Sequence, residues 1–375
     1  MRVILFFAAL ALCAQEFPPD IETLLKTART AYRKADYTAA RASLEQAWTT
    51  AAALAPNDPK RYEILKQLSG VLGSAGDNDD AETYIQLAIN WRETTIGRED
   101  PLIADDLIEL ATVCERRKDF DRAIAILQRV IGMHAKVHGN VENSDVADDF
   151  SRIALVQAAQ DKPDLAISTL QTVLGIREKV LGQDSPGLLS ELDRLGALQI
   201  TARTYEAAET TFRRALVIRE RVVGSKSPDL LTTLDGLAYS LFGQKKYDDA
   251  EGFYNRLLDL WTLIGNQMMI AETDEKIAVF YREQGKWEEG TNAASAAIAL
   301  RALVSAAGLS TEATAWIAHG DKQHAIDIYK KAVATLDPDR REHDGLREQL
   351  KQILLQYESA PPRATKPATN KKQPA

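Results

Sequence analysis

The sequence has only two cysteines, and they lie far apart. Cys13 ends an apolar run at the N-terminus, and Cys114 lies in the interior of the chain. Once the N-terminal run is removed, Cys114 has no partner within the chain, so disulfide bonds contribute nothing to stability. We expect Cys114 to pack as a small hydrophobic residue rather than to act as a reactive thiol.

Positively charged residues are fewer than negatively charged ones. The 375 residues contain 46 Lys and Arg against 54 Asp and Glu, which gives a formal net charge of -8 and a pI near 5.4. A protein that binds nucleic acid needs a basic stripe to contact the phosphates, and the sequence contains none. Nucleic acid is therefore excluded as the expected partner.

The clearest apolar run covers residues 3–12, close to the N-terminus. It is shorter than the roughly 20 residues that a membrane-spanning helix needs. Arg2 precedes the run, and the short residues Cys13 and Ala14 follow it. This layout predicts a signal peptide over residues 1–14 and export to a periplasmic or secreted location in a bacterium, with no membrane span in the mature chain. A lipid anchor on Cys13 and an uncleaved anchor are the alternatives.

Motifs that carry chemistry are missing as well. No glycine loop of the phosphate-binding type follows a strand, and no strand is predicted. His134 and His138 stand at the spacing of two metal ligands, but zinc sites need three or four protein ligands and no neighbouring residues complete a set. His319, His324 and His343 are interpreted as surface residues. We expect no catalytic residue, no metal and no cofactor.

What the sequence does contain is a repeat of small residues. The anchors stand 41 to 43 residues apart over the first six, and the last interval is 35; they are Ala40, Ala81, Ala123, Ala166, Ala208, Ala250, Gly290 and Ala325. Twelve residues before each anchor lies a second small residue, in order Ala28, Ser69, Ala111, Ala154, Gly196, Ala238, Ala278 and Ala313. Small residues at a constant offset allow two helices to cross closely. The sequence therefore predicts eight helix pairs, the last of them compact.

The unit from Ser227 to Gly265 shows the pattern most clearly. Ser227 and Pro228 start the first helix, and Gly243 is expected to end it. A second helix carries the anchor Ala250 and ends by Gly265. Other units are joined by the same signals, a glycine stop followed four residues later by a proline.

On these residues the chain resembles the tetratricopeptide repeats, and among them the 42-residue variety found in kinesin light chains. The resemblance covers about residues 21–335. It implies an all-α fold, a right-handed superhelical solenoid of antiparallel helix pairs. Residues 336–358 are expected to form a C-terminal capping helix, and residues 360–375, rich in proline and lysine, a disordered tail.

The resemblance also implies that the first helix of each pair lines the wall that faces a partner. Kinesin light chains clamp a cargo peptide with an asparagine two residues before the small crossing residue. The matching residues here are Glu109, Arg152, Arg194, Gly236 and Lys276, so this kind of clamping is not expected. The predicted wall is mixed, with an acidic track of Asp193, Asp235 and Glu275, an aromatic contact at Tyr239, and the bases Arg152, Arg194 and Lys276. An ordinary solvated helix face is the alternative interpretation.

These features predict a non-enzymatic, exported scaffold that holds a protein or peptide partner on a helical solenoid. A structural subunit that self-associates or packs in an envelope complex is the alternative. An enzyme or a glycan-binding module is a third possibility, of a different class.

Overall fold

The computed structural model describes residues 20–359, and every regular element within that range is helical. This confirms the all-α fold class. The predicted signal peptide, Cys13 and the predicted C-terminal tail lie outside the described residues. The chain divides into two compact units, one ending at Glu191 and the other beginning at Leu192. The division falls inside one helix.

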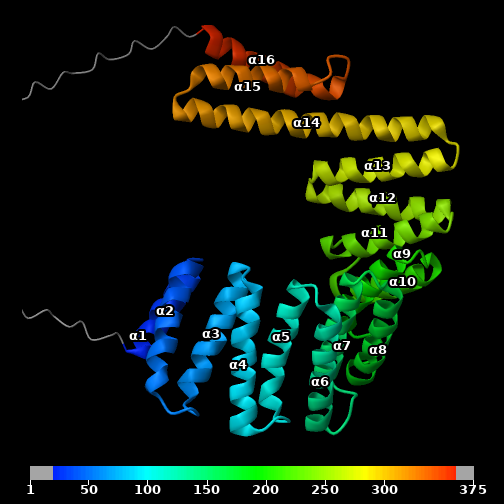
Figure 1. Cartoon of the computed structure of the whole chain (residues 1–375). Helices are drawn as coiled ribbons and strands as arrows, with labels where there is room; N and C mark the ends of the chain where they lie inside the picture. Colours follow the sequence, from blue (N-terminus) through cyan, green and yellow to red (C-terminus); the bar gives the residue numbers. More distant parts are fainter. Residues whose placement is uncertain (1–19, 360–375) are drawn as a thin grey trace, which may run out of the picture. The chain divides into compact units, whose positions relative to one another are not determined.

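The first unit contains four helix pairs. Their helices are α1 (Ile21–Arg33), α2 (Tyr37–Thr50), α3 (Pro59–Ala75), α4 (Asn78–Ile96), α5 (Ala104–Arg116), α6 (Phe120–His138), α7 (Ser144–Ala159) and α8 (Pro163–Leu181). The second unit, including most of α9, contains α9 (Leu189–Thr201), α10 (Tyr205–Val223), α11 (Leu231–Gly243), α12 (Tyr247–Ile264), α13 (Gln267–Glu283), α14 (Trp287–His319), α15 (Lys322–Thr335) and α16 (Asp344–Ser359). Within each unit, consecutive helices run antiparallel and stack side by side (Figure 1).

The small residues lie where the helices cross. All sixteen positions of the repeat are buried. Gly196 illustrates the constraint, because a Cβ atom there would lie 2.6 Å from the ring of Phe212 on the neighbouring helix. Within each unit the core is therefore a stack of close crossings filled by leucine, isoleucine and valine, as the period predicts.

The turn inside each pair has one backbone geometry throughout. The residue two positions before the second helix adopts a left-handed conformation, and these residues are Ala35, Gly76, Lys118, Asp161, Arg203, Lys245, Gly285 and Gly320. In the turn after α11 the helix ends at Gly243, as predicted, but the glycine does not supply the left-handed conformation. Gly243 is the last residue of α11 and Lys245 takes the left-handed turn. Gly243 is small for another reason, since a Cβ atom would lie 2.6 Å from the ring of Tyr205.

The joins between pairs follow the predicted stop and restart in three cases. Gly97, Gly182 and Gly224 end second helices with positive φ, and each is followed by a short 3-10 helix that starts at a proline. These are η2 (Pro101–Ile103), η3 (Pro186–Leu188) and η4 (Pro228–Leu230). The side chains of Asp100, Ser185 and Ser227 cap them by accepting a backbone N–H bond.

The predicted eighth pair is built differently. No turn separates the second helix of the seventh pair from the first helix of the eighth, because both belong to the continuous 33-residue helix α14. The segment from Leu300 to Thr311 has no proline and is rich in alanine, so nothing stops the helix. The last interval is short because a loop is missing, which corrects the expectation of a compact eighth hairpin.

The C-terminal part of the second unit packs on the second half of α14. Helix α15 lies against α14, and α16 lies against α15 (Figure 1). The capping helix begins at Asp344, after η5 (Arg341–His343). His343 is buried rather than exposed, and its Nε2 lies 3.1 Å from the carbonyl oxygen of Ala299 in α14, within hydrogen-bond distance. The surface interpretation of His343 was therefore wrong.

Helix α14 is also the one helix among residues 20–359 that is long and apolar enough to cross a membrane by length and composition. In the structure it packs against α13 and α15. The expectation of a mature chain without a membrane span stays a prediction.

Candidate protein-binding site

The first helix of several pairs presents an exposed apolar side chain directly after its buried small residue. Leu155 in α7, Tyr239 in α11 and Val279 in α13 are 49%, 43% and 40% exposed. The residues before them, all at helix crossings, are buried. Because these positions recur in register, the first helices of the second unit expose Tyr239 and Val279 on equivalent faces. Exposed apolar and aromatic side chains of this kind favour a protein contact.

The three predicted acids of the wall are each paired with a base. The Asp193 carboxylate lies 2.5 Å from Arg219 of α10, Asp235 lies 2.8 Å from Lys276, and Glu275 lies 2.7 Å from Arg301 of α14. The Asp235–Lys276 pair links α11 with α13, so it brings two predicted wall residues together. The acids therefore do not form a run of uncompensated negative charge. The two more exposed pairs, Asp235–Lys276 and Glu275–Arg301, contribute little to stability, whereas Asp193–Arg219 is more shielded from water.

The remaining predicted bases point to solvent. Arg194 in α9 and Arg152 in α7 are exposed, and within residues 20–359 neither takes part in an ion pair. Arg152 lies in the first unit and the other predicted wall residues in the second. Arg194 is thus the base of the second unit's wall with a head group open to a partner.

A row of aromatic rings supports Tyr239. Its ring centroid lies 6.5 Å from that of Tyr205 and 6.4 Å from that of Phe242, which in turn lies 6.5 Å from Phe280. Tilted contacts at these distances are favourable for aromatic pairs. The row fixes the exposed ring of Tyr239 on a rigid base, which lowers the entropy lost when a partner packs on it.

The first unit has a hollow on its own first helices. A cavity of about 390 Å³ opens between α1 and α3 and is lined by Ala28, Arg29, Tyr32, Arg33, Leu44, Gln67, Gly70 and Val71. Gly70 occupies the register position that Tyr239 has in α11, and the missing side chain leaves room there. Sequence reasoning missed this hollow, although a glycine at that position was a visible signal.

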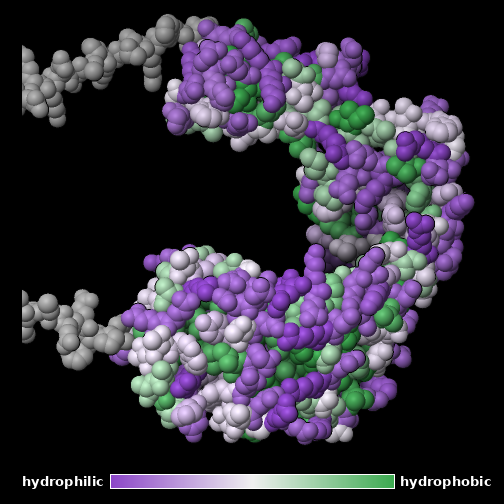
Figure 2. Space-filling view, viewed as in Figure 1, coloured by the Kyte–Doolittle hydropathy of each residue, from purple (hydrophilic) through white to green (hydrophobic). Residues whose placement is uncertain are grey.

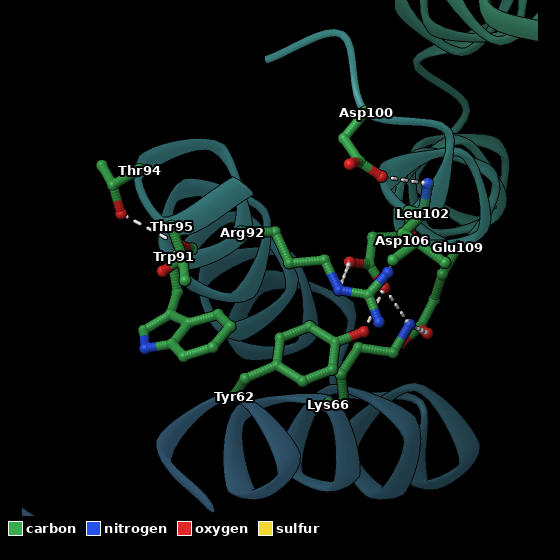
Figure 3. A network of polar contacts seen from close by, with 10 residues as sticks. All are labelled: Tyr62, Lys66, Trp91, Arg92, Thr94, Thr95, Asp100, Leu102, Asp106 and Glu109. Atoms are coloured by element: carbon green, nitrogen blue, oxygen red, sulfur yellow. Dashed lines mark hydrogen bonds and ion pairs between the residues drawn. The ribbon is translucent and has the colours of Figure 1, made fainter. Parts of the chain in front are cut away.

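A second feature that the sequence did not reveal is a buried polar joint between the second and third pairs (Figure 3). Asp106 of α5 is fully buried and lies 2.8 Å from both Tyr62 Oη and Lys66 Nζ of α3. Arg92 of α4 reaches the same carboxylate at 3.3 Å and lies over the ring of Tyr62. Lys66 also pairs with Glu109 at 2.5 Å. Burial, together with the bond to Asp106, raises the pKa of Tyr62.

This joint recurs along the chain at equivalent positions. A base on a second helix meets an acid on the next first helix: Arg92 with Asp106, His134 with Asp149, and Arg177 with Glu191. At the next joint Thr233 replaces the acid, and Arg219 contacts both Thr233 and Asp193. Each joint therefore links two pairs through a polar contact that is largely shielded from water, where electrostatic interactions are strong.

The histidines belong to one of these joints. His134 Nδ1 lies 2.7 Å from the buried Asp149, and His138 Nε2 lies 2.6 Å from Asp145. Burial raises the pKa of Asp149, an effect that the hydrogen bond to His134 opposes. Among residues 20–359, no group of three or more His, Cys, Asp or Glu side chains is arranged to hold a metal ion.

Geometry and comparison agree on the class of protein. The chain is a helical-repeat protein whose antiparallel pairs are joined by close crossings and polar contacts. The family model of the tetratricopeptide repeat matches residues 61–136 and 189–262. These two segments are tetratricopeptide repeats, so the chain contains repeats of this family. No curated protein matches it significantly.

One solved structure with a TM-score above 0.5 shows the same fold, and two others are similar over part of the chain. The C-terminal part of a TPR repeat-containing protein from Cytophaga hutchinsonii matches with a TM-score of 0.54 and 14% identity, over 74% of this chain and 95% of that one. The TPR-like repeats of a putative kinesin light chain from Podosopora anserina match with a TM-score of 0.47 and 19% identity, over 55% of this chain and 98% of that one. BtubC (BKLC) from P. vanneervenii matches with a TM-score of 0.48 and 21% identity, over 65% and 92%.

Proposed function

We propose that this chain is a non-enzymatic scaffold that binds a segment of another protein on the first helices of its second unit. The observation that carries the proposal is the exposed ring of Tyr239, which stands on a row of packed aromatic side chains beside the exposed Val279. A large, rigid aromatic side chain on an otherwise polar wall is the usual centre of a protein interface.

The charges of the wall set orientation more than affinity. Asp235 and Glu275 keep oxygen lone pairs toward solvent while each is paired with a base, and Arg194 adds an exposed guanidinium. A partner with mixed charge around an apolar contact is therefore favoured over a uniformly basic one. Such charges mainly change the association rate and weaken as salt is added.

The test is capture of the native partner by the mature chain after crosslinking, with quantification by mass spectrometry. Tyr239→Ser should reduce capture by about tenfold or more. Arg194→Glu should have a smaller effect than Tyr239→Ser, and its effect should be larger at low salt than at high salt. Val217→Ser, at a more exposed position on the second helix α10, is the matched control. Equal capture by the parent and by Tyr239→Ser would refute the wall as the binding surface.

We further propose export, from the apolar run at residues 3–12 and the short residues after it. The partner is then another exported or envelope protein. Cleavage after Ala14 is favoured, and a lipid anchor on Cys13 is the alternative.

A further inference from the structure

Each second helix of the first six pairs carries two side chains that are at least partly buried, and the first of the two is aromatic in four of the six. One stands three residues before the anchor, at Tyr37, Asn78, Phe120, Pro163, Tyr205 and Tyr247, and all six are partly buried. The other stands eight residues after the anchor, at Trp48, Ile89, Ile131, Leu174, Leu216 and Leu258, and these are buried or partly buried. The two positions therefore mark the face on which a following first helix packs.

The seventh pair also has large apolar residues at these two positions, but no following helix packs on them. Trp287 is 67% exposed and Ile298 is 62% exposed, both on the first half of α14. The reason is the continuity of α14, which runs straight on where the chain would otherwise turn back (Figure 1). Hydrophobic side chains also reach the surface over α14 in Figure 2. This face of the seventh pair is left open.

The polar part of the joint is also unfilled. Arg301 stands eleven residues after its anchor, as Arg92 and Arg177 do, and those two meet an acid of the next pair. Within residues 20–359 the ion pair of Arg301 is with Glu275, inside its own repeat. Arg219 likewise pairs with Asp193 of its own repeat, but it also contacts Thr233 of the next pair. Within residues 20–359 Arg301 has no such contact with a following helix.

The chain's own helices are poor occupants of this open face. The first helices that pair with a base of this series share one pattern. An acid is followed by three variable residues, then by Leu or Ile, and then by a small residue, as in Asp106 to Ala111 and Glu191 to Gly196. In the second half of α14 the matching positions hold Gly308 and the exposed Glu312. In α1 they hold Thr23 and Thr27, both exposed, so the N-terminal end of a second copy offers a polar cap.

We propose that the open face of α14, defined by Trp287, Ile298 and Arg301, binds an amphipathic helix of a partner protein. The partner helix carries a carboxylate four residues before a Leu or Ile that a small residue follows. Its apolar side chain covers Ile298 and Trp287, and its carboxylate pairs with Arg301, which supplies the charge complementarity. This surface does not include Tyr239, although Arg301 also pairs with Glu275 of the wall.

The test uses the full chain and one defined probe. The probe is a fluorescein-labelled peptide of residues 185–202, stapled on its solvent face to hold it helical, and it contains Glu191, Leu195 and Gly196. Fluorescence anisotropy should give saturable binding at one site. Arg301→Gln and Ile298→Ser in the protein, and Glu191→Gln in the peptide, should each raise the dissociation constant by about tenfold. The Arg301 and Glu191 changes should not add, because both remove the same contact.

Two controls separate this surface from others. Leu263→Ser alters a side chain of α12 that is 68% exposed and should leave the dissociation constant unchanged, as should Tyr239→Ser. Absence of saturable binding, or equal binding to Ile298→Ser and the parent, would overturn the proposal. Sedimentation of the free protein covers the remaining occupant: a dimer that dissociates in Ile298→Ser would show that a second copy fills the face, which also overturns it.

Discussion

Replacing Asp106 by asparagine should destabilise the first unit strongly. The carboxylate is fully buried and holds Tyr62, Lys66 and Arg92, two of which are cations with about a fifth of their side chains exposed. Asparagine keeps the shape but removes the negative charge. Losing one partner of a buried ion pair costs about 3–5 kcal/mol. Because Lys66 retains Glu109, we expect a loss near the lower end, about 3 kcal/mol.

The assay has to resolve a local effect, because a repeat protein opens first at its weakest joint. Urea unfolding followed by circular dichroism gives the free energy of unfolding. Hydrogen exchange measured by mass spectrometry should show faster exchange in α3 to α5 and little change in α11 to α13. Glu109→Gln is the control, since this half-buried carboxylate should cost about 1 kcal/mol. The reasoning fails if Asp106→Asn costs no more than Glu109→Gln.

A compensating variant tests the cause. Asp106→Leu combined with Lys66→Met and Arg92→Met removes the two cations together with their counterion. Apolar replacement of a complete buried network is often neutral or stabilising, whereas removal of one member is not. The triple variant should therefore be more stable than Asp106→Leu alone, and a triple variant that is less stable would show that the charges themselves stabilise the joint.

Three further predictions address packing, acid stability and processing. Ala238→Trp should lower the thermal midpoint sharply, because overpacking a crossing costs about 1–3 kcal/mol or more, whereas Ala197→Trp at an exposed position should not; equal melting curves would contradict the crossing. Although burial opposes it, bonds from Lys246, Arg213 and Gln244 lower the pKa of Glu209 from 4.5 to about 2. The stabilisation from Glu209 is thus present above pH 4.5 and lost as the pH falls towards 2, so the melting temperatures of Glu209→Gln and the parent should converge over that range, and a constant difference would argue against the pKa shift. Mass spectrometry of the native protein should find Gln15 as the first residue, and a chain that begins at Met1 or at an acylated Cys13 would disprove the predicted cleavage.

The fold could be predicted because the crossing residues are under a steric constraint that sequence records directly. Gly196 and Ala238 are small because a neighbouring helix occupies the space, and the same need recurs in every pair. The joins could be predicted for a similar reason, since the positive φ at Gly224 favours glycine and the ring of Pro228 fixes its own φ. Gly243 ends its helix as predicted, but the left-handed residue of the turn is Lys245, because a glycine needed for close approach looks the same in sequence as one needed for a turn.

The wall could be predicted in position but not in electrostatics. Register alone identified the exposed face that carries Tyr239. The partners of Asp193 and Glu275, however, lie on second helices 26 residues away, and only the packed structure shows that Arg219 and Arg301 reach them. The prediction of an acidic track stays untested as a binding surface, and its charge is balanced.

The polar joints explain why neighbouring pairs differ while their backbones repeat. At the first joint the two matching positions hold Ala51 and Ile64, both apolar, whereas the next three joints hold a base and an acid together. At the joint after these, Arg219 meets Thr233 and takes its acid, Asp193, from its own repeat. A base facing isoleucine, or an acid facing alanine, would be a buried charge without a partner, which costs several kcal/mol. Each joint therefore accepts one kind of neighbour and rejects the other. The open face of α14 carries a base of this series, so the same physical rule gives it a preference for a helix with an acid in register.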